Sequence, residues 1–236
     1  MELFDDLIQK AEVLLSGKRR ILPLPKRIWN TLSEETMIFR DEAKIDFGGE
    51  NRPAVSTLFV TSDPNKIPQD EITLIGDDIS DCQNPQSYGR ILTLLVDENG
   101  IGKTKEQLFR ALQRLDTIRY HLFPEGVQLR ISPLLRREEI RISKEAFQKG
   151  FSFADLGKLW IEAYRRISFV RHVQITFITS SAFDYPALRQ IAEKEEGITK
   201  ALDHLLRKTA MDCHTCKLQV ICNDVEKMVN QGFPKE

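Results

Sequence analysis

The chain has 236 residues, enough for one large domain or two small ones with a full hydrophobic core. Its 34 basic and 35 acidic residues nearly cancel, so no overall field favours nucleic acid or an anionic membrane as a partner. The first residues are acidic, and nowhere do about eighteen apolar residues follow one another, which predicts a cytoplasmic protein that does not span a membrane.

The first part of the chain predicts one helix, a basic hinge and several strands. Apolar residues recur at helical spacing from Leu3 to Leu15, and Gly17 ends the pattern. Pro23 and Pro25 prevent the basic stretch that follows from continuing the helix. Extended, β-branched segments then predict strands at residues 43–47, 55–61 and 72–75. The pair Gly48-Gly49 indicates a turn after the first of them.

The middle of the chain alternates between strand and helix patterns. Residues 90–96 form a continuous apolar run, which is typical of an interior strand covered on both faces. Ser143 is expected to cap a short helix. Further strands are predicted at residues 127–131, 140–142 and 173–179. Helices are predicted at residues 108–122, at 151–167 and from 185 onward.

These elements predict an α+β (or α/β) fold with a mixed β-sheet packed with helices and a helical C-terminal segment that carries cysteines. Three regions are expected. Residues 1–26 form an N-terminal helix and hinge, residues 27–184 form the α/β core, and residues 185–236 form the helical tail.

Three cysteines in the tail point to metal chemistry. Cys213, Cys216 and Cys222 give a CxxC followed six residues later by a third thiol, a soft ligand set that suits an iron–sulfur cluster or zinc. In a reducing cytoplasm this grouping is more typical of a metal or redox site than of a disulfide framework. A fourth ligand would come from Cys82, His204, His214, a partner chain or solvent. The alternative is that the thiols stay reduced and pack as small apolar groups.

Residues 97–104, Asp-Glu-Asn-Gly-Ile-Gly-Lys-Thr, partly match a phosphate-binding loop. The full pattern needs glycine where Asp97 stands, and a carboxylate there would repel phosphate. The favoured interpretation is therefore a strand-to-helix turn in which Thr104 caps the helix and Gln107 completes a capping box. Lys103 stays a candidate for nucleotide chemistry.

A series of short motifs occurs in one order along the chain. They are Phe47-Gly-Gly-Glu-Asn-Arg-Pro53, Ile72-Thr-Leu-Ile-Gly-Asp-Asp-Ile79, Ile140-Arg-Ile-Ser-Lys-Glu-Ala-Phe-Gln-Lys-Gly-Phe151 and Val173-Gln-Ile-Thr-Phe-Ile-Thr179, followed by the CxxC. This series resembles the central region of acetyl-CoA synthase, the β subunit of the carbon monoxide dehydrogenase/acetyl-CoA synthase complex, together with the start of its A-cluster domain.

The resemblance implies that Cys213, Cys216 and Cys222 help to hold the cubane of the nickel–iron–sulfur A-cluster. The chain departs from the family here. The gap between the second and third cysteines is shorter, and the fourth cubane cysteine would fall near Gly232, where none stands. The family's later Cys-Gly-Cys, which holds the outer nickel, would lie beyond Glu236. Without that nickel the carbonyl and methyl groups lack a metal on which to meet, so we expect that this chain alone does not make acetyl-CoA.

The resemblance also implies that coenzyme A approaches the middle domain through arginines and a tryptophan. The matching stretch here, residues 130–141, has arginines but no tryptophan. Because guanidinium groups are suited to bind a diphosphate, the coenzyme A-binding candidates are Arg130, Arg136, Arg137 and Arg141. The alternative is an exposed set of mutual ion pairs among Arg137, Glu138, Glu139 and Arg141.

The sequence thus favours an acetyl-CoA synthase-like accessory or interaction module of anaerobic one-carbon metabolism. Its expected partner is a protein of one-carbon or corrinoid metabolism, and its tail would hold an iron–sulfur cluster or be the remnant of such a site. Two alternatives stay open. One is a transferase acting on coenzyme A or a related nucleotide, and the other is a structural protein stapled by zinc.

Overall fold

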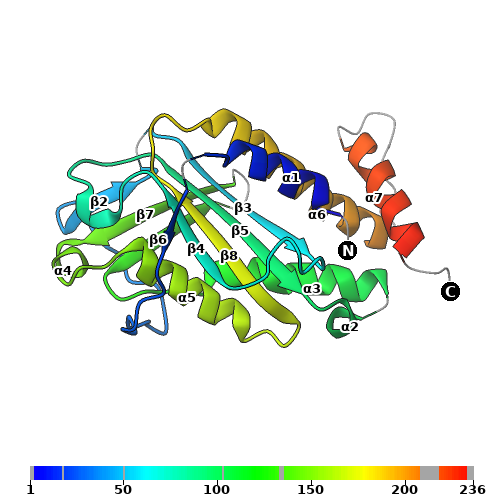
Figure 1. The fold of residues 1–236 in the computed structure, drawn as a ribbon, viewed down its shortest axis with the longest axis horizontal. Coiled ribbons are helices and arrows are strands. Elements are labelled where there is room, and N and C mark those ends of the chain that lie inside the picture. The colour runs from blue at the N-terminus through cyan, green and yellow to red at the C-terminus, as the bar shows by residue number, and fades with distance from the viewer. Residues whose placement is uncertain are drawn as a thin grey trace.

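The computed structural model describes residues 3–17, 19–49, 51–102, 104–132, 136–207 and 218–232. Two β-sheets and the helices that cover them form the molecule (Figure 1). The larger sheet has five strands in mixed orientation, and the smaller sheet has three antiparallel strands. The predicted α+β class, with a mixed sheet, is confirmed.

The larger sheet has the strand order β1-β4-β8-β5-β3. Its strands are β1 (Arg20–Leu22), β3 (Ala54–Thr61), β4 (Glu71–Ile75), β5 (Tyr88–Val96) and β8 (Val170–Ile178). The pairs β3/β5 and β4/β8 are parallel, whereas β5 and β8 meet antiparallel in the interior. Every residue of β5 is buried, which confirms the interior strand predicted from its continuous apolar run.

The smaller sheet has the order β2-β7-β6. Its strands are β2 (Ala43–Phe47), β6 (Val127–Ser132) and β7 (Arg137–Ser143). The predicted turn at Gly48-Gly49 takes the chain from β2 into β3, and therefore from one sheet to the other. Glycine is required at the first of these positions, because φ is +73° and a Cβ atom on Gly48 would lie 2.7 Å from the Cβ of Ala54.

Helices cover both faces of the larger sheet (Figure 1). Helix α5 lies across one face, and α1 and α6 lie together on the other, where α6 packs on β3. The two remaining long helices, α3 and α7, both contact α6. The helices are α1 (Asp5–Leu14), α2 (Glu98–Ile101), α3 (Lys105–Thr117), α4 (Lys144–Gln148), α5 (Phe153–Arg165), α6 (Tyr185–Arg207) and α7 (Gln219–Gly232), with single 3₁₀ turns at Ile79–Asp81 and Ile118–Tyr120.

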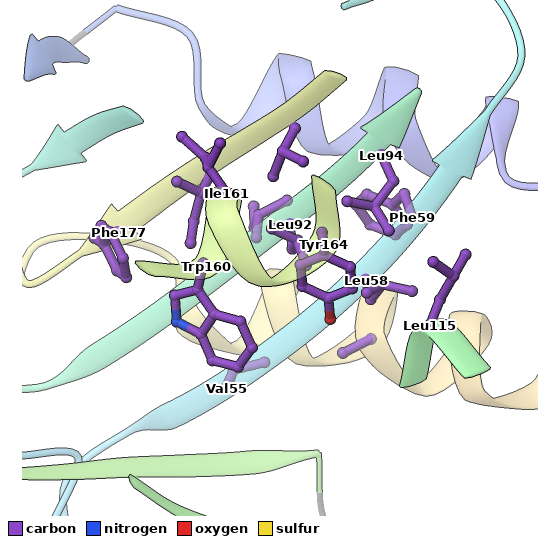
Figure 2. Close-up of a cluster of buried hydrophobic side chains, with 14 of the residues drawn as sticks. Val55, Leu58, Phe59, Leu92, Leu94, Leu115, Trp160, Ile161, Tyr164 and Phe177 are labelled. Atoms are coloured by element: carbon purple, nitrogen blue, oxygen red, sulfur yellow. The ribbon is translucent and has the colours of Figure 1, made fainter. Parts of the chain in front are cut away.

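The hydrophobic core lies between α5 and the larger sheet. Figure 2 shows Trp160, Ile161 and Tyr164 of α5 directed toward Leu92 and Leu94 of β5. Burying an aromatic or leucine side chain of this kind contributes about 2 kcal/mol or more to stability. The same hydrophobic cluster continues to residues of α1, α6 and α7, so the packing extends from one end of the described chain to the other.

Candidate anion-binding site

A cavity of about 180 Å³ opens on the outer face of the smaller sheet. Its most distinctive feature is the presence of three arginine side chains in one small hollow. The residues that line it are Arg40, Asp46, Phe47, Gly49, Arg130, Glu139, Ile140 and Arg141. Below we call this cavity the arginine pocket.

Strand pairing brings these side chains together. Arg130 of β6 stands opposite Glu139 of β7, and Asp46 of β2 stands opposite Arg141 of β7. Because side chains alternate across a strand, Glu139 and Arg141 share one face of β7, whereas Glu138 points to the other face. Glu139 and Arg141 therefore line the pocket from the same face of β7.

Ion pairs hold the pocket's guanidinium groups in place. Arg141 Nε donates to Asp46 Oδ1 at 2.9 Å, and its Nη1 donates to the carbonyl oxygen of Ile38 at 2.8 Å. Arg130 Nη1 lies 3.2 Å from Glu139 Oε2, and 54% of the Arg130 side chain is exposed. Three arginines and two carboxylates line the pocket, and guanidinium groups are suited to bind an anionic ligand.

The remaining two candidate arginines lie elsewhere. Arg137 is on the same face of β7 but donates to Glu139 Oε1 at 2.6 Å and to the carbonyl oxygens of Arg52 and Gly48. Arg136 is buried, with Nη2 at 3.2 Å from Glu195 Oε1. The structure therefore brings Arg130 and Arg141 to one pocket, places Arg137 beside it and places Arg136 away from it.

A buried ion pair fixes β7 against the larger sheet. Arg90 Nε donates to Glu138 Oε1 at 2.8 Å, and the hydroxyl of Tyr88 donates to the same oxygen at 3.1 Å. The guanidinium of Arg90 also lies over the ring of Trp160, at 4.6 Å from its centroid. Burial, and then the negative charge of Glu138, raises the pKa of Tyr88, which keeps its hydroxyl protonated as a donor.

Glu138 therefore does not belong to an exposed set of ion pairs. The alternative interpretation of residues 137–141 is right that Arg137 and Glu139 pair with each other, although both side chains are half-buried. Arg141 pairs with Asp46, which lies outside that set. The interpretation is wrong for Glu138, which is fully buried, because strand alternation turns this position toward the protein interior.

A model of the CO dehydrogenase/acetyl-CoA synthase complex beta subunit family matches residues 30–183. The chain belongs to this family. All the residues that line the arginine pocket lie inside the matched span, whereas the three tail cysteines follow it. No curated protein matches the chain.

Two of the three cysteines predicted to bind a metal lie outside the described ranges. Cys213, Cys216 and His214 all lie there. Cys222 is half-buried on α7 and packs beside the hydrophobic cluster. Within the described part of the chain, no group of three or more His, Cys, Asp or Glu residues could hold a metal ion.

Cys82, a candidate for the fourth ligand, is buried just after the first 3₁₀ turn. Burial raises the pKa of its thiol to about 11, and the charges of Asp77, Asp81 and Asp78 act in the same direction. A thiol in this environment stays protonated at neutral pH, whereas metals bind the thiolate. His204, another candidate, is half-buried on α6.

The turn before α3 has the capping geometry that the sequence favoured. The Thr104 hydroxyl accepts from Gln107 N at 3.2 Å, and the Gln107 side chain accepts from Thr104 N at 3.1 Å. Asp97 caps α2 by accepting from Asn99 N. Lys103 lies outside the described ranges. The side chains of Asp97, Thr104 and Gln107 thus accept hydrogen bonds from backbone N–H groups at the starts of α2 and α3.

Sequence reasoning missed Arg40, Asp46 and Glu139 as pocket residues. Asp46 and Glu139 could have been found from strand alternation once β2 was known to pair with β7. Arg40 lies before β2 in a segment without regular secondary structure, where no periodicity predicts which way a side chain points.

Among the described helices, none is both long and apolar enough to cross a membrane.

Proposed function

We propose that this chain is an accessory module of CO dehydrogenase/acetyl-CoA synthase chemistry that binds the phosphate groups of coenzyme A in the arginine pocket. The observation that carries the proposal is the convergence of Arg40, Arg130 and Arg141 on one cavity inside the span that matches the family. A guanidinium group presents several N–H donors in a plane and keeps its charge at any physiological pH, so three of them suit a diphosphate.

The carboxylates of the pocket support this role. Asp46 holds Arg141 in position through an ion pair, and Glu139 holds both Arg130 and Arg137, so part of the ordering that binding requires is already present in the protein. Arg130 is the side chain that can turn toward a ligand, because it is more than half exposed and contacts Glu139 through one nitrogen. Arg141 is held in one position, because it donates both to Asp46 and to the carbonyl oxygen of Ile38.

We propose that the chain binds coenzyme A but does not make acetyl-CoA by itself. Its 236 residues contain four cysteines, and none of them is part of a Cys-Gly-Cys sequence. We further propose that Cys213, Cys216 and Cys222 hold an iron–sulfur cluster, with zinc as the alternative metal, and that the module acts beside a protein of one-carbon or corrinoid metabolism. The support for the metal is the soft thiolate set itself.

Calorimetric titration with coenzyme A, and separately with pantetheine, tests the pocket. Coenzyme A should bind and pantetheine, which lacks phosphates, should not. Arg130→Ala should weaken coenzyme A binding about tenfold or more, because a charge-assisted hydrogen bond contributes about 1.5–3 kcal/mol. The matched control is Arg110→Ala on the exposed surface of α3, where the side chain is 74% exposed. Equal affinity of both variants for coenzyme A would remove the pocket from the proposal.

A further inference from the structure

The side chains that face the arginine pocket are charged, and its two apolar residues are directed away from it. Asp46 and Phe47 are neighbours on β2, and Glu139 and Ile140 are neighbours on β7. Because neighbouring side chains on a strand point to opposite faces, the apolar member of each pair is directed into the protein. Phe47 and Ile140 are at most 1% exposed, and the Phe47 ring packs edge-on against Phe153. Neither side chain therefore offers a flat apolar face to a ligand.

The pocket is too small to enclose a nucleotide. Its volume of about 180 Å³ lies below the range of about 300–1,000 Å³ that is typical of pockets for drug-sized ligands. The Arg130 side chain is 54% exposed, so a group bound to it remains accessible to solvent. A compact anion can thus enter the pocket while the rest of its molecule extends outward.

Gly49 keeps part of this space open. A Cβ atom at this position would lie 3.3 Å from the Cβ of Asp46 and 3.8 Å from its carboxylate oxygen Oδ2. A larger side chain would therefore crowd the carboxylate that holds Arg141. Glycine leaves room for a compact anion beside this arginine.

Recognition of an adenine base usually depends on an aromatic ring on which the base stacks. Among the described residues that line the pocket, Phe47 is the single aromatic, and its ring is buried. Phe39, which precedes Arg40 in the chain, is 59% exposed but stands outside the lining residues. The pocket therefore has charge for phosphates and no aromatic face for a base.

We infer that the arginine pocket recognises the diphosphate group alone, so that the nucleoside attached to it adds little to binding. The inference rests on the proposed function and widens its ligand class from coenzyme A to nucleoside diphosphates and inorganic pyrophosphate. Affinity comes from charge-assisted hydrogen bonds between guanidinium groups and phosphate oxygens. The adenosine and pantetheine parts of coenzyme A lie outside the pocket.

Glu139 sets the strength of this binding. Its Oε1 accepts from Arg137 Nε at 2.6 Å, and its Oε2 lies 3.2 Å from Arg130 Nη1. A phosphate group bound to Arg130 therefore comes close to a carboxylate of the same charge, which opposes binding. Glu139→Gln keeps the shape of the side chain and removes this charge, so it should raise the affinity of the pocket for diphosphates.

Calorimetric titration with inorganic pyrophosphate, ADP, coenzyme A and adenosine, at one salt concentration, tests the inference. The three diphosphates should bind with dissociation constants within about threefold of one another, and adenosine should not bind. Arg130→Ala should weaken the binding of all three by the same factor. Glu139→Gln should strengthen it about threefold or more. The matched control Glu106→Gln, on α3 where the side chain is 64% exposed and pairs with Arg110, should leave it unchanged.

Two outcomes would overturn the inference and leave the proposed function intact. One is binding of coenzyme A or ADP at least tenfold more tightly than pyrophosphate, because the adenosine part would then be held as well. The other is equal affinity of Glu139→Gln and wild type for all three diphosphates, because the diphosphate would then lie away from Glu139. Binding of pyrophosphate and ADP without coenzyme A would overturn the proposed function and leave the diphosphate class standing. No binding of any diphosphate would overturn both.

Discussion

Two glutamates, Glu138 and Glu195, are buried, and their hydrogen-bond partners differ. Glu138 receives both Arg90 and Tyr88. Glu195 on α6 receives Arg136 at one oxygen, while its Oε2 has no hydrogen-bond partner among the described residues. Burial raises the pKa of Glu195 to about 7, although the charges of Arg136 and Arg119 oppose the rise. Asp116 and Glu196 add to it. The ionised form of Glu195 is therefore disfavoured in the folded protein.

The free energy of unfolding should depend on the protonation of Glu195. The pKa of its carboxyl is near 4.5 when unfolded and about 7 when folded, so the folded state binds more protons between these values. The contribution of this carboxyl to stability should be full below about pH 4.5 and should be lost as pH rises to about 7. Glu195→Gln stays neutral and should be more stable than wild type at pH 8 by about 1–3 kcal/mol. Urea unfolding at pH 5 and pH 8 measures the difference.

Glu193→Gln provides the control for this experiment. Glu193 lies two residues earlier on the same helix and is exposed, so its replacement should leave the pH dependence of unfolding unchanged. A Glu195→Gln variant that loses stability with rising pH as steeply as wild type would show that another group causes the dependence.

The pair of Arg90 and Glu138 predicts a large loss of stability when one partner is removed. Arg90→Met leaves a buried carboxylate without its cation and should lower the free energy of unfolding by about 3–5 kcal/mol. Glu138→Leu should cost a similar amount for the opposite reason. The double variant should cost clearly less than the sum of the two, and urea unfolding of the four proteins measures this coupling. Additive losses would contradict a direct interaction.

At the scale of single residues, part of the site followed from the sequence and part did not. Arg130 and Arg141 were identified as anion ligands, and both line the pocket. Arg136 is adjacent in sequence to Arg137 but lies in the turn before β7 with a positive φ of 44°. This conformation directs it toward α3 and α6. Sequence alone does not predict such a backbone angle for a residue other than glycine.

At the scale of elements, hydrophobic periodicity predicted most of the helices and strands of the described chain. It did not predict β1 (Arg20–Leu22), which lies in the stretch expected to be a hinge, or the short helix α2 (Glu98–Ile101). The interior strand β5 and the capping box of α3 are the clearest cases, because each depends on residues close together in sequence. Strand order could not be predicted in the same way. β2 and β3 are separated by a short turn yet belong to different sheets, and this separation depends on contacts between residues far apart in the chain.

The capping box of α3 gives a prediction at this scale. Thr104→Ala removes the hydroxyl that accepts from Gln107 N, and it should lower the free energy of unfolding by about 1 kcal/mol. Thr104→Ser keeps an oxygen at the cap and should restore most of that loss. Chemical denaturation of both variants, together with calorimetric titration with ATP, separates a cap from a phosphate-binding loop. ATP binding that disappears in Thr104→Ala would contradict the capping interpretation.

At the scale of the whole molecule, the tail cysteines predict a bound metal. After anaerobic purification the wild-type chain should contain iron and acid-labile sulfide, and Cys216→Ser should lose both. Cys82→Ala is the control, because Cys82 is buried with a raised thiol pKa and should not bind the metal. One equivalent of zinc without sulfide would favour the zinc alternative. Metal-free protein of unchanged stability would exclude both.

Hydrogen exchange with and without coenzyme A tests the central claim most directly, because it locates the ligand on the chain. The account predicts slower amide exchange around β2 and along β6 and β7, where the arginine pocket lies. Exchange near Thr104 at the start of α3 should not change. Protection near Thr104 alone, or no protection anywhere at saturating coenzyme A, would contradict it.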